Sequence, residues 1–177
     1  MDRSTVFTLP NLVSTSRFAL ALGFVAADAA PVKLALLGIA SVTDVLDGWL
    51  ARRSKLVTEF GAMLDPIADR FFVLGVMVAY VAGGQLTLLQ AGLIMLRDVM
   101  SVIGYVTAKL VSWLRDIPFR ARFMGKVVTV AQLFTFFVVL VAPTWVATCV
   151  WIVAALGAVA SVDYTLMLWR ERRRELV

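Results

Sequence analysis

Four aspartates in otherwise apolar segments form the pattern of this sequence that is most capable of chemistry. They are Asp44, Asp47, Asp65 and Asp69. A charged side chain at the centre of a membrane helix costs at least ~2.5 kcal/mol on insertion scales. A group of four in such segments therefore needs compensation by bound cations, by basic partners or by a water-filled cavity.

Basic neighbours offer a purely structural explanation for these carboxylates. Arg52, Arg53 and Arg70 could each pair with one of them, and for a single aspartate that explanation is as good as a functional one. It explains four together much less well. Since the chain has no histidine, metal binding or acid–base chemistry would use carboxylates, which suit hard cations such as Mg²⁺ or Mn²⁺. Two such ions can hold a pyrophosphate and neutralise a departing phosphate, so the sequence predicts a phosphoryl-transfer site.

The spacing of the acidic residues predicts that they meet at one place. Two sets share helix faces: Asp44, Asp47, Gly48 and Arg52 on a helix expected at about 32–53, and Gly61, Asp65 and Asp69 on one expected at about 60–81. Asp44 and Asp47 are three residues apart, and steps of four separate the members of the series 44, 48, 52 and of the series 61, 65, 69. Such spacings place residues along one side of a helix. Because the intervening loop is short, we expect the two helices to be antiparallel neighbours with their acidic faces together. The glycines either let a nucleotide approach the backbone or only permit close helix packing.

Membrane helices are the elements expected to position these residues. Of the 177 residues, 61% are hydrophobic and 16% charged, and one small water-soluble fold could not bury so much apolar surface. A membrane span needs roughly 20 apolar residues, and breaks at Pro31, Gly83-Gly84, 112–122 and Pro143 separate six such stretches. We therefore expect an all-α integral membrane protein with six transmembrane helices, at about 12–29, 32–53, 60–81, 86–110, 123–141 and 144–168.

The distribution of basic residues predicts the orientation in the membrane. Lysine and arginine gather near the N-terminus, after the second helix, between the fourth and fifth helices and at the C-terminus, whereas the opposite side has only Lys33. Short cytoplasmic loops carry such an excess, so both termini and the acidic cluster are expected to face the cytoplasm. We expect one membrane-embedded domain over 1–177, with an interfacial segment at 1–11 and a basic tail at 169–177 that anchors at the lipid surface. No cleaved signal is expected at the N-terminus.

The acidic cluster carries a specific resemblance to a known family. Its two parts are Asp44-x-x-Asp47-Gly48-x-x-Ala51-Arg52 and, after eight further residues, Gly61-x-x-x-Asp65-x-x-x-Asp69. With all eight fixed positions present, this pattern resembles the complete signature of the CDP-alcohol phosphotransferases, and a looser similarity extends from about Pro10 to Gln132. The resemblance implies a six-helix membrane enzyme that transfers a phosphatidyl group from CDP-diacylglycerol to a hydroxyl acceptor and releases CMP.

The resemblance also implies roles for individual residues. Two divalent ions, Mg²⁺ or Mn²⁺, would be held by Asp44, Asp47, Asp65 and Asp69. Asp69 would in addition be the base that activates the acceptor hydroxyl, although clustered carboxylates titrate as a group. The CDP donor would be contacted by Gly48, Arg52 and Gly61.

Two residues near the N-terminus are further candidates for donor binding. Taken alone, Asn11 is typical of a helix cap and Arg17 of an interfacial anchor. The stretch Pro10-Asn11-Leu12-Val13-Ser14-x-x-Arg17 is similar, however, to the entry of family members that make anionic glycerophospholipids. That resemblance implies that Asn11 and Arg17 bind the CDP donor.

Basic residues around the start of the fifth helix are candidates for binding an acceptor phosphate. The positive-inside bias alone could account for Arg120, Arg122 and Lys126. The stretch Gly125-Lys126-x-x-Thr129-x-x-Gln132 is similar, however, to phosphatidylglycerophosphate synthases and CMP-forming cardiolipin synthases. The similarity implies that these basic residues attract the phosphate of glycerol 3-phosphate or of phosphatidylglycerol.

Two other features bear on the choice of acceptor. Arg97-Asp98 is expected to form a self-compensating ion pair, and it resembles the cardiolipin branch, because the glycerophosphate branch usually has Glu at the second position. The Asn11-to-Arg17 entry and Asp65-Pro66 favour the glycerophosphate branch. Glycerol 3-phosphate is therefore the expected acceptor, with phosphatidylglycerol, inositol phosphate, serine or another alcohol as alternatives.

Other classes of function fit the sequence less well. A cation transporter would need polar groups across the whole bilayer, whereas the stretch from Phe72 to Val81 is almost wholly apolar. A membrane prenyltransferase would also use two Asp-rich helices, but the Asp-Gly-x-x-Ala-Arg spacing favours the phosphotransferase. The net charge of +5 suits anionic lipid rather than nucleic acid. The family resemblance implies a homodimer in a bacterial or archaeal cell membrane.

Overall fold

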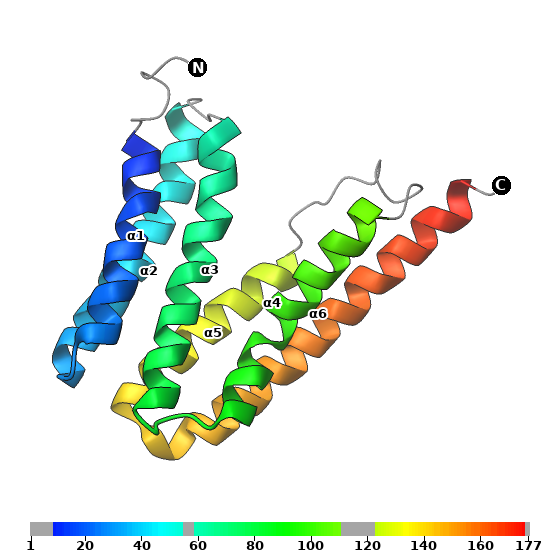
Figure 1. Cartoon of the computed structure of the whole chain (residues 1–177). Coiled ribbons are helices and arrows are strands. Elements are labelled where there is room, and N and C mark those ends of the chain that lie inside the picture. Colours follow the sequence, from blue (N-terminus) through cyan, green and yellow to red (C-terminus); the bar gives the residue numbers. More distant parts are fainter. Residues whose placement is uncertain (1–8, 55–58, 111–122, 176–177) are drawn as a thin grey trace. The chain divides into compact units, whose positions relative to one another are not determined.

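The computed structural model describes residues 9–54, 59–110 and 123–175, and side chains within 15–46, 67–104 and 124–165 apart from 45 and 164. These parts of the chain are entirely helical apart from short connections (Figure 1). The helices are α1 Leu9–Ala26, α2 Ala30–Ser54, α3 Glu59–Ala82, α4 Leu88–Leu110, α5 Phe123–Val141, the 3-10 helix η3 Pro143–Trp145, and α6 Val146–Glu175. The all-α prediction and the six long helices are confirmed.

Helix boundaries differ from the prediction mainly at the two ends of the chain. α1 begins at Leu9 rather than about residue 12, and Pro10 lies in its first turn, where a missing N–H costs no hydrogen bond. The predicted interfacial segment 1–11 therefore overlaps this helix. α6 continues to Glu175, through most of the segment 169–177 that was predicted as a separate tail. Arginine and glutamate are good helix formers, so the basic segment can extend the helix.

The chain divides into two compact units, one formed by residues 1–86 and the other by residues 87–177. In the first unit, α1 packs against both α2 and α3. Its contact with α3 is close, because a Cβ atom added to Gly75 would lie 3.2 Å from the Cβ atom of Ala21. Small residues at such a crossing allow two helix backbones to approach each other. Phe24 and Tyr80 are fully buried and pack edge to face, with ring centroids 5.4 Å apart.

The first unit ends at a tight turn that follows α3. Gly84 has φ of +70°, a conformation that glycine adopts without steric cost. The amide of Gln85 donates to the carbonyl of Tyr80, so one of the last carbonyls of the helix is satisfied. The predicted break at Gly83-Gly84 is therefore confirmed.

In the second unit, α6 packs against both α4 and α5. The buried side chains of this unit include Ile94, Val128, Phe136 and Val150. Several helical hydroxyl groups donate to the carbonyl four residues earlier: those of Ser101, Thr129, Thr135 and Ser161. This satisfies them within their own helices, as a lipid environment requires.

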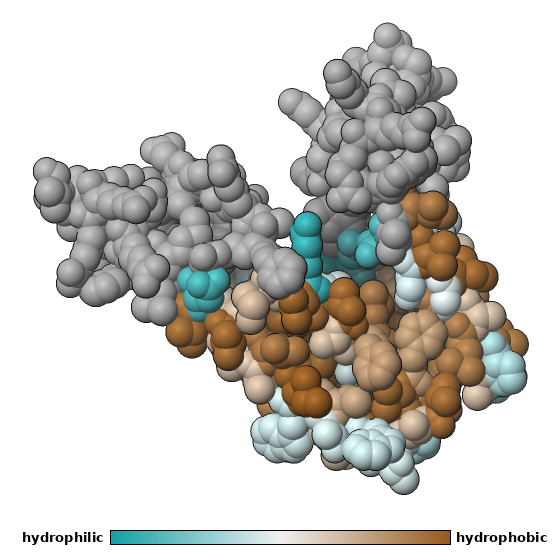
Figure 2. All heavy atoms as spheres, turned by 180° about the vertical axis from the view of Figure 1, so that it is seen from behind, coloured by the Kyte–Doolittle hydropathy of each residue, from teal (hydrophilic) through white to brown (hydrophobic). Residues whose placement is uncertain are grey.

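The outer surface of the helices is strongly apolar. Large hydrophobic side chains are exposed on both units, among them Leu22, Val78, Val130, Phe134 and Trp151. Figure 2 shows the hydrophobic surface that such side chains form. Two segments of the described chain are long and apolar enough to cross a membrane, Met124–Val141 and Pro143–Asp163. An exposed surface of this kind is unfavourable in water and favourable in lipid, which supports the predicted membrane location.

Candidate active site

A buried arginine of α1 joins the two acidic helices. The side chain of Arg17 is 4% exposed, and its Nη2 atom donates to Oδ1 of Asp44 in α2 at 3.0 Å. The same guanidinium group forms an ion pair with Asp69 of α3. One carboxylate from each acidic helix therefore reaches a common cation, although the two residues are far apart in the sequence. The prediction that the acidic faces of both helices come together is supported at these two positions.

The structure changes two interpretations of the N-terminal residues. Arg17 does not behave as an interfacial anchor, because its side chain is buried in the first unit and pairs with Asp44 and Asp69. Asn11 is the third residue of α1 and lies inside the helix, so the prediction that it caps the helix is wrong. The prediction from the sequence considered Arg52, Arg53 and Arg70 as partners of the aspartates and did not include Arg17. A single arginine in the middle of an apolar helix was the signal that could have identified it.

The remaining residues of the acidic cluster lie on the expected helices. Asp47, Gly48 and Arg52 belong to α2, and Gly61 and Asp65 belong to α3. Their side chains lie outside the described residues. The regular helix still places Asp65 one turn before Asp69, and Asp47 one turn after Asp44. The backbone therefore supports the shared helix faces that the spacing predicts.

The described part of the cluster has the chemistry of a cation site. The side chains of Asp44 and Asp69 are 46% and 47% exposed, so solutes can reach both carboxylates while each also contacts the Arg17 guanidinium. Among the described side chains, no three carboxylate, histidine or cysteine residues come together; the side chains of Asp47 and Asp65 are not among those described. Carboxylate oxygens are the type of ligand that suits a hard divalent cation such as Mg²⁺.

The candidate residues for the acceptor lie in or near the second unit. Lys126 is in the first turn of α5, and its side chain is exposed. Arg120 and Arg122 lie outside the described residues. An exposed ammonium group at this position can meet a phosphate group without a large desolvation cost.

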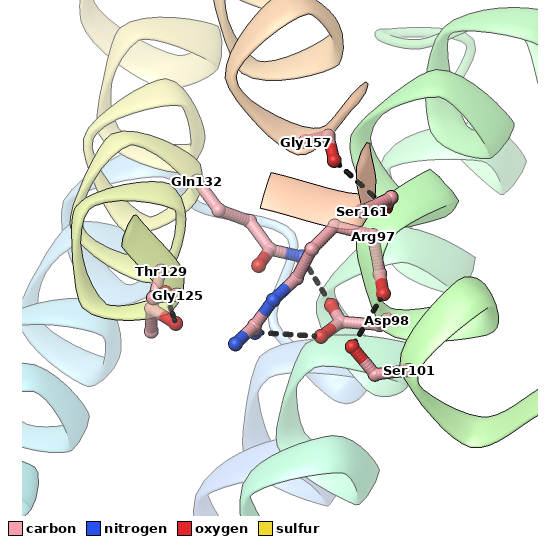
Figure 3. A network of polar contacts seen from close by, with 8 residues as sticks. All are labelled: Arg97, Asp98, Ser101, Gly125, Thr129, Gln132, Gly157 and Ser161. Atoms are coloured by element: carbon pink, nitrogen blue, oxygen red, sulfur yellow. Dashed lines mark hydrogen bonds and ion pairs between the residues drawn. The ribbon is translucent and has the colours of Figure 1, made fainter. Parts of the chain in front are cut away.

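A second polar group lies between α4 and α5 (Figure 3). Arg97 donates from Nη1 to Oδ1 of Asp98 at 3.2 Å, which confirms the predicted ion pair. Gln132 of α5 donates from Nε2 to Oδ2 of the same aspartate at 3.3 Å, and this amide is almost fully buried. The sequence did not predict the link to Gln132. A single amide in an apolar helix was the available signal, since a buried polar group needs a partner.

Comparisons with known proteins agree with this picture. The family model described as CDP-alcohol phosphatidyltransferase matches residues 7–162. A CDP-diacylglycerol–glycerol-3-phosphate 3-phosphatidyltransferase of Pectobacterium atrosepticum is 37% identical over 153 residues, which cover 77% of this chain and 79% of the relative. The protein of the same name from Escherichia coli is 31% identical over 179 residues, covering 92% of this chain and 90% of the relative.

A relative with a different name matches a shorter region. A probable CMP-forming cardiolipin synthase of Drosophila melanogaster is 31% identical over 102 residues, which cover 55% of this chain and 32% of the relative. The family match spans most of the chain, including both acidic helices and the Arg97–Gln132 group. The chain belongs to the CDP-alcohol phosphatidyltransferase family and is a transferase of phospholipid biosynthesis.

Proposed function

We propose that this enzyme transfers the phosphatidyl group of CDP-diacylglycerol to glycerol 3-phosphate and releases CMP. The observation that carries the choice of acceptor is the match to relatives named for this reaction, one of which is similar over 92% of this chain. The Asn11-to-Arg17 entry and the Asp65-Pro66 pair point the same way. The product would be phosphatidylglycerophosphate.

The acidic cluster would hold two divalent ions, Mg²⁺ or Mn²⁺. The proposed ligands are Asp44, Asp47, Asp65 and Asp69. Support comes from their oxygen chemistry and from the geometry that brings Asp44 of α2 and Asp69 of α3 to one place at Arg17. Ions bound there would stabilise negative charge on the pyrophosphate and on the departing CMP.

Asp69 is the proposed base. Its carboxylate is half-exposed, so an acceptor hydroxyl can approach it. The carboxylate would take the proton while the hydroxyl oxygen forms a bond to the phosphorus on the lipid side of the pyrophosphate. The bond between that phosphorus and the bridging oxygen breaks, and CMP leaves with the electron pair.

The substrates would be bound by two groups of residues. The proposed contacts to the CDP donor are Asn11, Arg17, Gly48, Arg52 and Gly61. The proposed contacts to the acceptor phosphate are Arg120, Arg122 and Lys126. Arg17 would hold Asp44 and Asp69 while it contacts the donor, because a guanidinium group has five N–H donors.

The proposed setting is a bacterial or archaeal cell membrane. We propose that all six long helices span it within one domain, with both termini and the active site on the cytoplasmic side, and that two chains form a homodimer. Helices α1 to α4 have 18 to 25 residues. At about 1.5 Å per residue, even the shortest is close to the ~30 Å thickness of the hydrocarbon core.

CMP release by the purified enzyme tests the proposal. The protein would be given CDP-diacylglycerol and Mg²⁺ or Mn²⁺, with glycerol 3-phosphate, phosphatidylglycerol or inositol phosphate as acceptor. We expect release with glycerol 3-phosphate and its loss on chelation. Release only with phosphatidylglycerol would instead support a cardiolipin synthase, the second candidate, which the Drosophila relative and Arg97-Asp98 favour. No release with any acceptor would contradict the proposal and point to another CDP-alcohol donor or another acceptor.

A further inference from the structure

Arg97 extends along a path that two glycines keep open. A Cβ atom added to Gly157 of α6 would lie 3.2 Å from the Cβ atom of Arg97. A Cβ atom added to Gly125 of α5 would lie 2.6 Å from its Nη2 atom, closer than real side chains approach each other. The base of the arginine therefore packs on α6 and its guanidinium group lies over the backbone of α5. Any side chain at position 125 would displace that group.

Two further residues fix the guanidinium group. Its Nη1 atom donates to Asp98, and the other oxygen of Asp98 accepts from Gln132 of α5. Exposure decreases along this series, from 25% for Arg97 to 14% for the Asp98 side chain and 3% for Gln132. The inner residues are thus anchored, while a quarter of the Arg97 side chain stays accessible. Figure 3 shows the arginine extending past Asp98 toward the turn of α5 that contains Gly125.

Arg97 and Asp98 have more contacts with neighbouring helices than an ion pair needs for charge neutralisation alone. A charged pair inside a helical bundle rarely stabilises it more than well-packed apolar residues would. Arg97 and Asp98 are adjacent in the sequence and could neutralise each other without help from another helix. Instead, α5 contributes a buried amide that orients the carboxylate and a glycine that leaves room for the guanidinium group. Such orientation matters when an arginine must present its N–H groups to a ligand.

The direction in which Arg97 extends suggests what that ligand is. The guanidinium group lies over Gly125, and the next residue of α5 is the exposed Lys126. An arginine and a lysine that meet near the start of α5 would together bind a phosphate group. We propose that Arg97 binds the phosphate group of the acceptor and that Asp98, Gln132 and Gly125 position it for this contact. The inference rests on the proposed function, since it assigns a further residue to the same acceptor.

Kinetics of variants in lipid nanodiscs would test the role of Arg97. Arg97→Gln should raise the KM for the phosphate-bearing acceptor about tenfold or more and leave the KM for CDP-diacylglycerol within about twofold. Arg97→Lys should retain part of the affinity, because it keeps the charge but loses the planar group. The KM would be measured with glycerol 3-phosphate and with phosphatidylglycerol as acceptor. The acceptor whose KM rises in the variant is the one whose phosphate Arg97 binds. Equal changes for donor and acceptor would overturn the assignment.

A pair of glycine variants separates positioning from folding. Gly125→Ala leaves every charge in place but would push the guanidinium group aside, so the acceptor KM should rise as it does in Arg97→Gln. Gly92→Ala is the matched control, because this glycine of α4 has no other atom within 4 Å of the added Cβ. An unchanged acceptor KM in Gly125→Ala, with normal protein yield, would overturn the positioning role.

Direct binding distinguishes failure of this inference from failure of the proposed function. Glycerol 3-phosphate would be titrated into the wild-type protein and Arg97→Gln, with binding followed by calorimetry. CMP release by both proteins with the same acceptor KM would overturn the Arg97 inference and leave the proposed function standing. Binding that requires Arg97, without CMP release by the wild type, would overturn the proposed function alone. A third outcome is a wild type that does not bind glycerol 3-phosphate but turns over phosphatidylglycerol. In that case, a higher KM for phosphatidylglycerol in Arg97→Gln would assign Arg97 to the lipid phosphate. An unchanged KM for phosphatidylglycerol would overturn the inference.

Discussion

The Nη2 atom of Arg17 lies 3.0 Å from Oδ1 of Asp44, and this contact connects the first helix to the acidic face of the second. The same guanidinium group pairs with Asp69 on the third helix. A single buried cation thus holds one carboxylate from each half of the signature. The arrangement explains how strongly acidic helices can pack in an apolar environment, because the charge is compensated inside the bundle.

Removal of the Arg17 charge should destabilise the first unit. Arg17→Gln would leave Asp44 and Asp69 without their common partner, and we expect the free energy of unfolding to fall by about 1–3 kcal/mol. The half-exposed carboxylates keep this value below that of a fully buried pair. Thermal unfolding in detergent would measure the change.

Lys33 provides a matched control for that experiment. Its Nζ atom lies 5.6 Å from the ring centroid of Phe24, a cation–π contact that is worth about 0.5–1 kcal/mol. Lys33→Gln should therefore cost less than Arg17→Gln. Equal stability of Arg17→Gln and the wild type would contradict the bridging role of the arginine.

Replacement of the proposed base should stop turnover without removing the protein from the membrane. Asp69→Asn keeps the size of the side chain but cannot take a proton from the acceptor hydroxyl. CMP release should fall at least about 10²-fold. Membrane extraction and circular dichroism would verify insertion and helix content. Substantial activity that still depends on Mg²⁺ would mean that another group acts as the base.

The helix pattern of the fold was predictable because its breaks are chemically distinct. Pro31, Gly83-Gly84 and Pro143 interrupt long apolar stretches, and the helices start or end near each of them. Proline cannot continue a helix hydrogen-bond pattern, and glycine accepts the left-handed conformation found at Gly84. The helical extension through 169–175 was missed, because a run of charged residues fits a helix and an irregular tail equally well.

The acidic cluster was predictable, whereas the partners of its residues were not. Four carboxylates in apolar segments stand out because each is costly there. The choice of Arg17 as counter-ion depends on how α1 packs against two other helices, and periodicity within one helix contains no information about that. The link between Asp98 and Gln132 was missed for the same reason, since it joins residues of different helices.

Close packing between α1 and α3 leads to a prediction about Gly75. Gly75→Leu would place its side chain against Ala21, whose Cβ atom would be 3.2 Å from the new Cβ. We expect a loss of about 1–3 kcal/mol in unfolding free energy, as for other overpacked contacts. Gly38→Leu is the control, because an added Cβ there has no neighbour within 4 Å. Equal thermal stability of the two variants would show that α1 and α3 tolerate separation.

Lys126 should contribute to acceptor affinity more than to donor affinity. Its side chain is exposed in the first turn of α5, directly after the glycine over which the Arg97 guanidinium group lies. Lys126→Ala removes one of the cations proposed to meet the acceptor phosphate, and an exposed charge–phosphate contact is weaker than a buried one. We therefore expect the acceptor KM to rise about three- to tenfold, with the donor KM nearly unchanged and a smaller effect at high salt. Lys33→Ala, which removes a lysine from the opposite end of the predicted helices, should change neither constant. A parallel increase in the KM of donor and acceptor would remove Lys126 from the acceptor site and leave the positive-inside bias as the explanation for its charge.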